Sequence, residues 1–268
     1  MTERRIHFLA GLPRCGSTVL GSLLNQNPAV YVSPTSPLYS LLVNTNEHFN
    51  LLGLQYTFDE KRISDEVYRS LVDAFYPEER EFPIVFDKHR GWPKNVDAIR
   101  DYIDAEPKIV CPVRPIAEII ASYITLAERD PNNFIDAHLK RDGVAVNDEA
   151  RAMLLWSHYL KVPYECLTIG LKMHPEALLL VEYDDLVSDP EVTLRRVYEF
   201  CDLEPFAHDF DEIKNTCAEA KDEAWGLKSL HDIRPVIGKQ SVDPLTYLPQ
   251  SAIDYFSQFD LRQEASWR

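Results

Sequence analysis

The sequence is poor in the residues that hold small extracellular proteins together and in the segments that anchor proteins to membranes. Only five of its 268 residues are cysteines, and no two of them form a C-x-x-C pair. Their odd number and wide spacing argue against a disulfide framework and a structural zinc site, and favour a reducing, cytoplasmic environment. No apolar run is long enough to span a membrane and no signal-peptide core stands near the N-terminus, so we expect neither a membrane location nor secretion.

Positive charge is also scarce. The chain has 28 Lys and Arg against 43 Asp and Glu, a formal net charge of −15. Nucleic acids and heparin-like chains need a basic face, so we expect neither as a partner. Any anion must be held by a local cluster of Arg and Lys, and an acidic surface favours a neutral or cationic small molecule as the second ligand. The same acidity also serves solubility, and no part of the sequence indicates an oligomeric state.

Short apolar segments alternate with amphipathic ones along the chain. This alternation predicts a three-layer α/β protein whose central, mainly parallel sheet is covered by helices on both faces, in a single domain spanning residues 1–268. A chain of this length can bury a complete core. The polar stretch from Asn132 to Asn147 is expected to form a surface loop or a lid. Strands are predicted at 5–10, 29–32, 83–86, 108–113 and 177–181, and helices at 19–24, 38–77, 96–103, 114–128, 149–167 (interrupted near Pro163) and 193–200.

A glycine-containing segment follows the first predicted strand. Gly11–Thr18 reads GLPRCGST and matches the phosphate-binding pattern G-x-x-x-x-G-K-[ST], except that Ser17 stands in place of the lysine. Strand, glycine loop and helix in this order bring free backbone N–H groups and the positive end of a helix to one point, which suits a phosphate. The nearest cation is Arg14 inside the loop, so the segment favours a nucleotide without a triphosphate. The alternative is an ordinary Gly/Pro turn.

Further polar residues stand where other predicted strands end. Arg114 comes directly after one apolar segment, and Ser122 lies eight residues further on. Asp87–Arg90 and Tyr183 follow two other apolar segments. Because ligands of parallel α/β sheets bind at the carboxyl ends of the strands, we expect these side chains to surround the glycine loop. Taken alone, Arg114 and Ser122 would also fit a solvated surface pair.

In this order the segments resemble the sulfotransferases that use 3′-phosphoadenosine 5′-phosphosulfate (PAPS). The 5′-phosphosulfate loop of that family has the form P-[KR]-S-G-[ST]-T, which Pro13–Thr18 matches except at Cys15. Its 3′-phosphate site is an Arg at a strand end with a Ser eight residues later, as Arg114 and Ser122 stand here. Its Y-E-D-L-x-x-D-P segment, whose tyrosine helps to hold the nucleotide, is similar to Tyr183–Pro190, which reads YDDLVSDP. The resemblance spans residues 6 to about 205.

The resemblance also accounts for the missing lysine, because PAPS has no γ-phosphate to bind. It implies that Arg14 lies beside the bridging oxygen and the sulfuryl group, while Ser17, Thr18 and the loop backbone at Cys15 and Gly16 hold the 5′-phosphate. It further implies catalysis by positioning and charge stabilisation, as in phosphoryl transfer, with adenosine 3′,5′-bisphosphate as the product. No metal is required, and the sequence contains none of the usual metal-ligand spacings.

The base that would activate the acceptor is harder to assign. Many cytosolic sulfotransferases have K-x-H after this strand, whereas the order here is Lys88-His89-Arg90, so Arg90 stands in the place of the histidine. The resemblance makes Lys88 the residue that stabilises the sulfuryl group. His89 is the first candidate for the base because its unperturbed pKa suits one, although a strand-end histidine is commonly just solvated. Other possible bases are Glu47, His48 and Asp87.

The part of the chain from about residue 205 to 268 is expected to form loops and helices that close the nucleotide and acceptor site. Within it we expect Arg234 over the 3′-phosphate, the alternative being an exposed loop arginine. We therefore predict a PAPS-dependent sulfotransferase that acts on a hydroxyl or amine of a small, neutral or cationic acceptor. Two other functions stay open: a P-loop small-molecule kinase, which needs the lysine that Ser17 replaces, and a sulfotransferase-like binding protein without catalysis.

Overall fold

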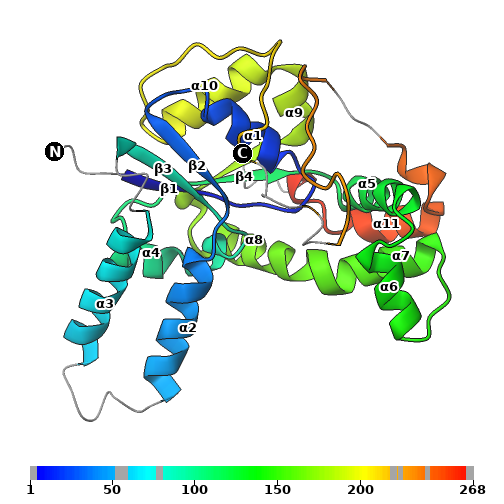
Figure 1. Cartoon of the computed structure of the whole chain (residues 1–268), viewed down its shortest axis with the longest axis horizontal. Helices are drawn as coiled ribbons and strands as arrows, with labels where there is room; N and C mark the ends of the chain where they lie inside the picture. Colours follow the sequence, from blue (N-terminus) through cyan, green and yellow to red (C-terminus); the bar gives the residue numbers. More distant parts are fainter. Residues whose placement is uncertain are drawn as a thin grey trace.

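Five strands form one parallel sheet in the computed structural model, which describes residues 5–51, 60–76, 81–217, 222, 226–238 and 242–263. Their order across the sheet is β2-β3-β1-β4-β5, and every pairing between them is parallel (Figure 1). This confirms the predicted α/β class, with a strand at each of the five predicted places. The strands are β1 (Arg5–Leu9), β2 (Val30–Thr35), β3 (Ile84–Lys88), β4 (Ile109–Val113) and β5 (Leu178–Glu182).

Helices cover both faces of this sheet (Figure 1). Successive side chains of a strand point to opposite faces, so Phe8 and Leu9 of β1 belong to two different apolar clusters. The cluster around Leu9 contains side chains of α1 (Ser17–Leu24) and α10 (Pro190–Phe200). The cluster around Phe8 contains side chains of α2 (Leu38–Leu51), α3 (Glu60–Phe75), α4 (Val96–Tyr102) and α8 (Lys161–Met173).

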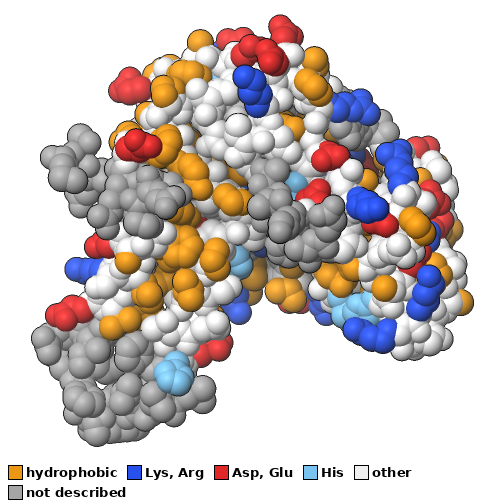
Figure 2. Space-filling view, viewed as in Figure 1, with side chains coloured by type: hydrophobic (Ala, Val, Ile, Leu, Met, Phe, Trp, Pro, Cys, Tyr) orange, Lys and Arg blue, Asp and Glu red, His pale blue; other side chains and the backbone are white. Residues whose placement is uncertain are grey.

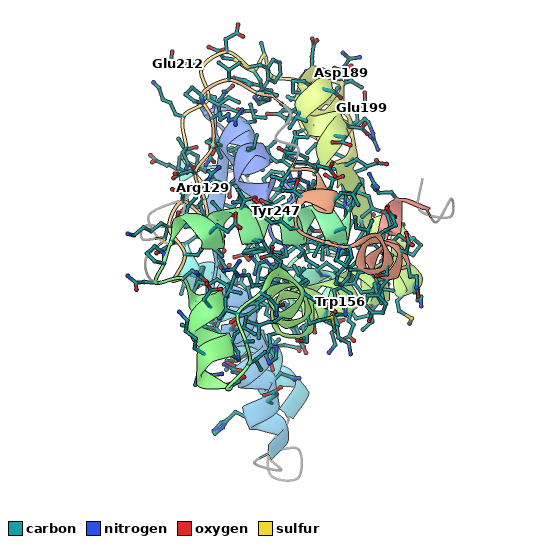
Figure 3. All side chains as sticks on the ribbon, turned by 90° about the vertical axis from the view of Figure 1, so that its right-hand side faces the viewer. Arg129, Trp156, Asp189, Glu199, Glu212 and Tyr247 are labelled. Atoms are coloured by element: carbon teal, nitrogen blue, oxygen red, sulfur yellow. The ribbon has the colours of Figure 1, made fainter. Side chains whose placement is uncertain are left out.

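A third apolar cluster lies beyond the carboxyl ends of the strands, on the right in Figure 1. It joins α5 (Ile116–Arg129), α6 (Phe134–Arg141), α7 (Asp148–Leu155) and α11 (Gln250–Ser257). Tyr247, which lies over α5 in Figure 3, accepts a hydrogen bond on its hydroxyl from Thr125 Oγ1 at 3.2 Å. Leu12 and Cys15 are buried in the same cluster, so the loop after β1 packs against these helices.

β2 is longer than the predicted strand. It continues through Ser33 and Pro34, which were expected to end it. The strand lies at an edge of the sheet, where a residue without an N–H group breaks no essential ladder bond. The extension brings Ser33 next to β3, where its Oγ atom accepts a hydrogen bond from the backbone N–H of Lys88 at 3.0 Å.

The expectation of a loop or lid over 132–147 is wrong, since α6 lies inside this stretch. Asn133 caps the helix by accepting a hydrogen bond from the backbone N–H of Asp136 at 2.8 Å. Both carboxylate oxygens of Asp136 bind the Arg151 guanidinium at 2.8 Å, and the buried side chains are Ile135, Asp136 and Leu139. The polar composition therefore reflects a short capped helix with one narrow apolar stripe.

The helix predicted over 149–167 consists of three segments. α7 is followed by a π-helical turn, Trp156–Leu160, and then by α8. The irregular turn precedes Pro163, because proline has no N–H group to donate to the carbonyl four residues earlier.

The described residues after Phe200 have little regular structure. They include two 3-10 turns, Pro244–Thr246 and Leu261–Gln263, on either side of α11. The remaining short elements are Trp92–Asn95 and Pro175–Ala177, both 3-10 turns, and α9 (Tyr183–Ser188). Across the described ranges, no helix combines the length and apolar character needed to cross a membrane.

Candidate functional site

A cavity of about 440 Å³ opens where β1, β3 and β4 end. Its walls come from the loop after β1, the turn after β3, the beginning of α5, part of α8 and residues 230–233. Residues far apart in the sequence meet here because parallel strands bring their carboxyl ends to one edge. The predicted site residues in the lining are Arg14, Gly16, Ser17, Thr18, Lys88, His89, Arg114, Ser122 and Tyr183.

The loop after β1 has an unusual backbone that requires glycine at two positions. Gly11 and Gly16 have φ angles of 106° and 89°, and Arg14 between them has 60°. A Cβ atom on Gly11 would lie 2.3 Å from the carbonyl oxygen of Pro112, and one on Gly16 would lie 3.0 Å from the Tyr183 ring. The loop thus lies close to β4 and α9, and α1 begins directly after it at Ser17, with its N-terminal N–H groups at the cavity.

Cys15 is part of this loop, but its side chain does not line the cavity. The thiol is fully buried in the cluster of α5 and α7 and donates a hydrogen bond to the carbonyl oxygen of Leu12. Burial raises the pKa of Cys15 to about 11, so the sulfur stays protonated. The side chain points away from the cavity lining into an apolar cluster, which explains why a cysteine is compatible with the loop.

Arg14 connects the loop with two other parts of the chain. Its Nε atom donates a hydrogen bond to Ser122 Oγ on α5 at 3.3 Å, and Nη1 donates to the carbonyl oxygen of Leu230. Burial lowers the pKa of Arg14, and the nearby Arg114 charge acts in the same direction. The sequence predicted both Arg14 and Ser122 as site residues, but not the bond between them.

Arg114 is buried at the beginning of α5. Its Nε atom lies 2.9 Å from Glu118 Oε2, and its guanidinium lies 4.4 Å from the centre of the Tyr183 ring. The cation and the aromatic ring attract each other, which fixes the orientation of both side chains. Glu118 was missed in the sequence, where its only signal is the four-residue spacing from Arg114 along one helix.

Lys88 is the last residue of β3 and is 8% exposed. Its Nζ atom is buried and has no hydrogen-bond partner among the described residues. A buried ammonium group without a partner is costly, and an anion within reach would remove that cost. Asp87, one residue earlier, is fully buried and bonds instead to Trp92 Nε1 at 2.7 Å and to the Tyr76 hydroxyl. Burial raises the pKa of Asp87, which does not line the cavity.

His89 lines the cavity with its ring stacked on Tyr39, at 4.3 Å between ring centres. Burial and then the Arg90 charge lower the pKa of His89 to about 4, so the ring is neutral near pH 7. Nδ1 accepts a hydrogen bond from the backbone N–H of Gly91 at 3.0 Å. In a neutral imidazole the other nitrogen then carries the proton, so Nε2 of His89 is a donor.

The other two candidate bases do not reach the site. Glu47 and His48 are exposed on α2, outside the cavity lining.

The charge of the cavity is opposite to that of the whole chain. On the face shown in Figure 2, Lys and Arg are scattered among Asp and Glu. The described cavity lining instead contains Arg14, Lys88, Arg90 and Arg114, with Asp232 as its carboxylate. Such a surface attracts anions to this one place.

The C-terminal segment contributes to the cavity in a way that the sequence did not indicate. Arg234 is exposed and is not among the lining residues, whereas Leu230–Ile233 are. His231 Nδ1 lies 2.5 Å from Asp222 Oδ1, and the two side chains are 12% and 19% exposed. Arg90 and Tyr123 also line the cavity. Among the described residues, no group of three or more His, Cys, Asp or Glu side chains is placed to hold a metal ion.

Comparison with known proteins gives one matching family model and several similar solved structures. A family model described as "Sulfotransferase family" matches residues 7–208. A sulfotransferase domain of a Synechococcus olefin synthase is 19% identical, with 77% of this chain and 76% of that chain covered and a TM-score of 0.46. A sulfotransferase from Alicyclobacillus acidocaldarius is 18% identical over 83% and 88% of the two chains, with a TM-score of 0.46. A sulfotransferase from Mycobacterium avium is 16% identical over 96% and 76%, with a TM-score of 0.49.

Proposed function

The chain belongs to the sulfotransferase family, and on this premise we propose that it transfers a sulfuryl group from PAPS to a hydroxyl or amine of a small-molecule acceptor. One observation carries the choice of donor: Lys88, whose buried Nζ atom has no hydrogen-bond partner in the described part of the chain, lines the same cavity as Arg14 and Arg114. PAPS presents a 5′-phosphosulfate and a 3′-phosphate, which are two separate anionic groups. The cations stand at the ends of three different strands, β1, β3 and β4, which suits a ligand with two separate anionic groups.

The loop and α1 would bind the 5′-phosphate. Backbone N–H groups at Cys15 and Gly16, together with Ser17 and Thr18, lie at the positive end of a helix that has no acidic residue in its first turn. Arg14 would lie at the sulfuryl group. It is already oriented by Ser122, so little conformational freedom has to be lost when the donor binds.

Arg114, Ser122 and Tyr183 would hold the rest of the nucleotide, with Arg114 at the 3′-phosphate. Glu118 and the Tyr183 ring keep the Arg114 guanidinium in one orientation. We further propose that the chain works as one sulfotransferase domain, in which the part after about residue 205 closes the site. Arg234 would approach the 3′-phosphate only after a movement of its segment, because it is exposed outside the cavity.

The transfer itself follows the logic of phosphoryl transfer. The acceptor oxygen or nitrogen forms a bond to sulfur while the bond from sulfur to the phosphate oxygen breaks, and adenosine 3′,5′-bisphosphate leaves with the electron pair. Charge grows on the equatorial sulfuryl oxygens and on the leaving oxygen. Arg14 and Lys88 would stabilise that charge from fixed positions, and His89 would contribute a hydrogen bond from Nε2. The acidity of the chain favours a neutral or cationic acceptor.

Ligand binding followed by turnover tests this function. We expect adenosine 3′,5′-bisphosphate to raise the melting temperature, and ATP with Mg²⁺ to leave it unchanged. Protection by ATP and Mg²⁺ alone would instead support the kinase alternative. Labelled PAPS with a panel of small hydroxyl and amine acceptors should then yield sulfated product. Binding of PAPS and adenosine 3′,5′-bisphosphate without turnover on any acceptor would support a binding protein without catalysis.

A further inference from the structure

Two histidines, His89 and His231, stand in the described lining of the cavity, and their Nδ1 atoms have opposite hydrogen-bonding roles. His89 accepts a hydrogen bond on Nδ1 from the Gly91 N–H group, so its Nε2 carries the proton. His231 has Asp222 at its Nδ1, at a distance of 2.5 Å. An ionised carboxylate can only accept hydrogen bonds, so Nδ1 of His231 must donate. In the neutral ring, Nε2 of His231 is then the basic nitrogen, which is the opposite of His89.

The pairing of His231 with Asp222 uses both carboxylate oxygens. Oδ1 faces the ring, while Oδ2 accepts a hydrogen bond from the backbone N–H of His231 at 3.0 Å. The backbone contact alone would attach the segment, and the contact to the ring additionally fixes its tautomer and direction. A carboxylate at Nδ1 also stabilises the charged imidazolium that forms when Nε2 takes up a proton.

Hydrogen bonds to neighbouring backbone groups hold His231 near the loop. The carbonyl oxygen of Leu230 accepts a hydrogen bond from Arg14 Nη1, and the carbonyl oxygen of His231 accepts one from Asn215 Nδ2 at 2.9 Å. His231 therefore follows directly after the residue that contacts Arg14, and it lines the same cavity. His231, whose Nε2 has the basic lone pair, therefore lies in the segment that contacts the loop after β1.

We propose that His231 is the general base of this site and that Asp222 is its positioning residue. This assignment rests on the proposed function, in which no residue was assigned to take the proton of the acceptor. As the acceptor oxygen bonds to sulfur, its proton passes to His231 Nε2, and the sulfur–oxygen bond to the phosphate breaks. Adenosine 3′,5′-bisphosphate departs with the electron pair, and the imidazolium later releases the proton to water.

Activity with two acceptors of similar shape can show whether His231 acts as a base or only supports the loop. Phenol keeps its proton near neutral pH, since a phenolic hydroxyl has a pKa of about 10, whereas para-nitrophenol is largely ionised at mildly alkaline pH and needs no base. The variant His231→Asn keeps an amide N–H group able to reach Asp222 but has no basic nitrogen. Asp222→Asn keeps an acceptor oxygen but loses the charge that stabilises the imidazolium.

We expect His231→Asn to lower kcat with phenol about 10²- to 10⁴-fold, the usual contribution of general acid–base catalysis, and to change kcat with para-nitrophenol less than about threefold. Asp222→Asn should show the same selectivity with a smaller loss. Adenosine 3′,5′-bisphosphate should bind both variants as tightly as the wild type. His158→Asn, which changes an exposed histidine outside the cavity, should leave both acceptors unaffected.

The possible failures are distinguishable. If the wild type transfers sulfuryl to neither phenol nor any other acceptor in the panel, the proposed function itself fails. If the wild type is active but His231→Asn lowers both acceptors equally, or neither, His231 is not the base. A variant that no longer binds adenosine 3′,5′-bisphosphate also contradicts the inference, because His231 would then serve the donor site.

Discussion

The two sides of the cavity are held in place by different kinds of interaction. On the sheet side, formed by the ends of β1, β3 and β4, ladder hydrogen bonds run between neighbouring strands and apolar clusters cover both faces. On the C-terminal side, residues 226–238 contain no helix or strand. Single contacts hold them, such as those from the Phe134 N–H group to Gly226 O at 2.8 Å and from the Lys228 N–H group to Asp130 Oδ2 at 3.3 Å.

This difference has a physical consequence for the groups on each side. A residue at a strand end moves only if the strands around it move, so its charge is fixed before a ligand arrives. A segment held by a few separate hydrogen bonds can shift when one of them is lost. The charged groups of the sheet side are therefore held more firmly than the residues of the C-terminal side.

Among residues of the sheet side, the largest expected effect concerns Lys88. Replacing it with methionine keeps most of the side-chain volume and removes the ammonium group, and we expect kcat to fall about 10²- to 10³-fold. The affinity for adenosine 3′,5′-bisphosphate should change little, because the product has no sulfuryl group. Steady-state kinetics with PAPS and calorimetry with the product measure the two effects. Lys94→Met, in an exposed position, is the matched control. An equal loss of product affinity would contradict the assignment of Lys88 to the sulfuryl group.

The second prediction concerns Arg114, whose loss alone would leave the half-buried Glu118 without its cation. We therefore change both residues to glutamine, which keeps the charge balanced. The affinity for adenosine 3′,5′-bisphosphate should fall about 10- to 100-fold, the weight of hydrogen bonds to a charged group. The affinity for adenosine 5′-phosphate should stay the same, as calorimetry can show. If both nucleotides weaken equally, Arg114 does not bind the 3′-phosphate.

A third prediction compares two glycines with positive φ angles. Gly16 has a φ of 89° and Gly143 has 71°, but a Cβ atom would meet the Tyr183 ring only at Gly16. Each change to alanine should lower the free energy of unfolding by about 1–2 kcal/mol through the left-handed backbone alone. Only Gly16→Ala should also weaken nucleotide binding. Chemical unfolding and calorimetry on both variants check this, and equal binding by the two would mean that the loop tolerates a shift against α9.

The smallest effect concerns the stability of the sheet side at low pH. Burial lowers the pKa of His7 to about 4, and neither ring nitrogen has a hydrogen-bond partner among the described residues. The unfolded chain binds a proton near the ordinary pKa and the folded chain does not, so stability present above about pH 6.5 falls as the pH drops toward 4. In urea unfolding at pH 7.5 and 5.5, His7→Phe should reduce the loss between the two pH values by about 1 kcal/mol. An unchanged loss would mean that His7 is protonated in the folded protein.

Local patterns in the sequence predicted most of the fold. The five strands could be located because buried parallel strands are short apolar runs, and the glycine spacing indicated the loop after β1. The helix α6 was missed because a short capped helix with only two buried apolar side chains has a polar composition. The extension of β2 through Pro34 was missed because proline is unfavourable in a strand unless that strand lies at an edge, and the strand order is not a local property.

The sequence by itself determined which residue types stand at the strand ends, since Arg14, Lys88, Arg114 and the loop glycines follow from motifs and apolar segments. Only the tertiary structure decided how they are arranged. The bond from Arg14 to Ser122, the burial of the Lys88 ammonium group, and the different partners at Nδ1 of His89 and His231 depend on which distant segments meet. A proton's position on an imidazole ring is set by its hydrogen-bond partner, and no spacing along the chain encodes a partner that the fold brings from another segment.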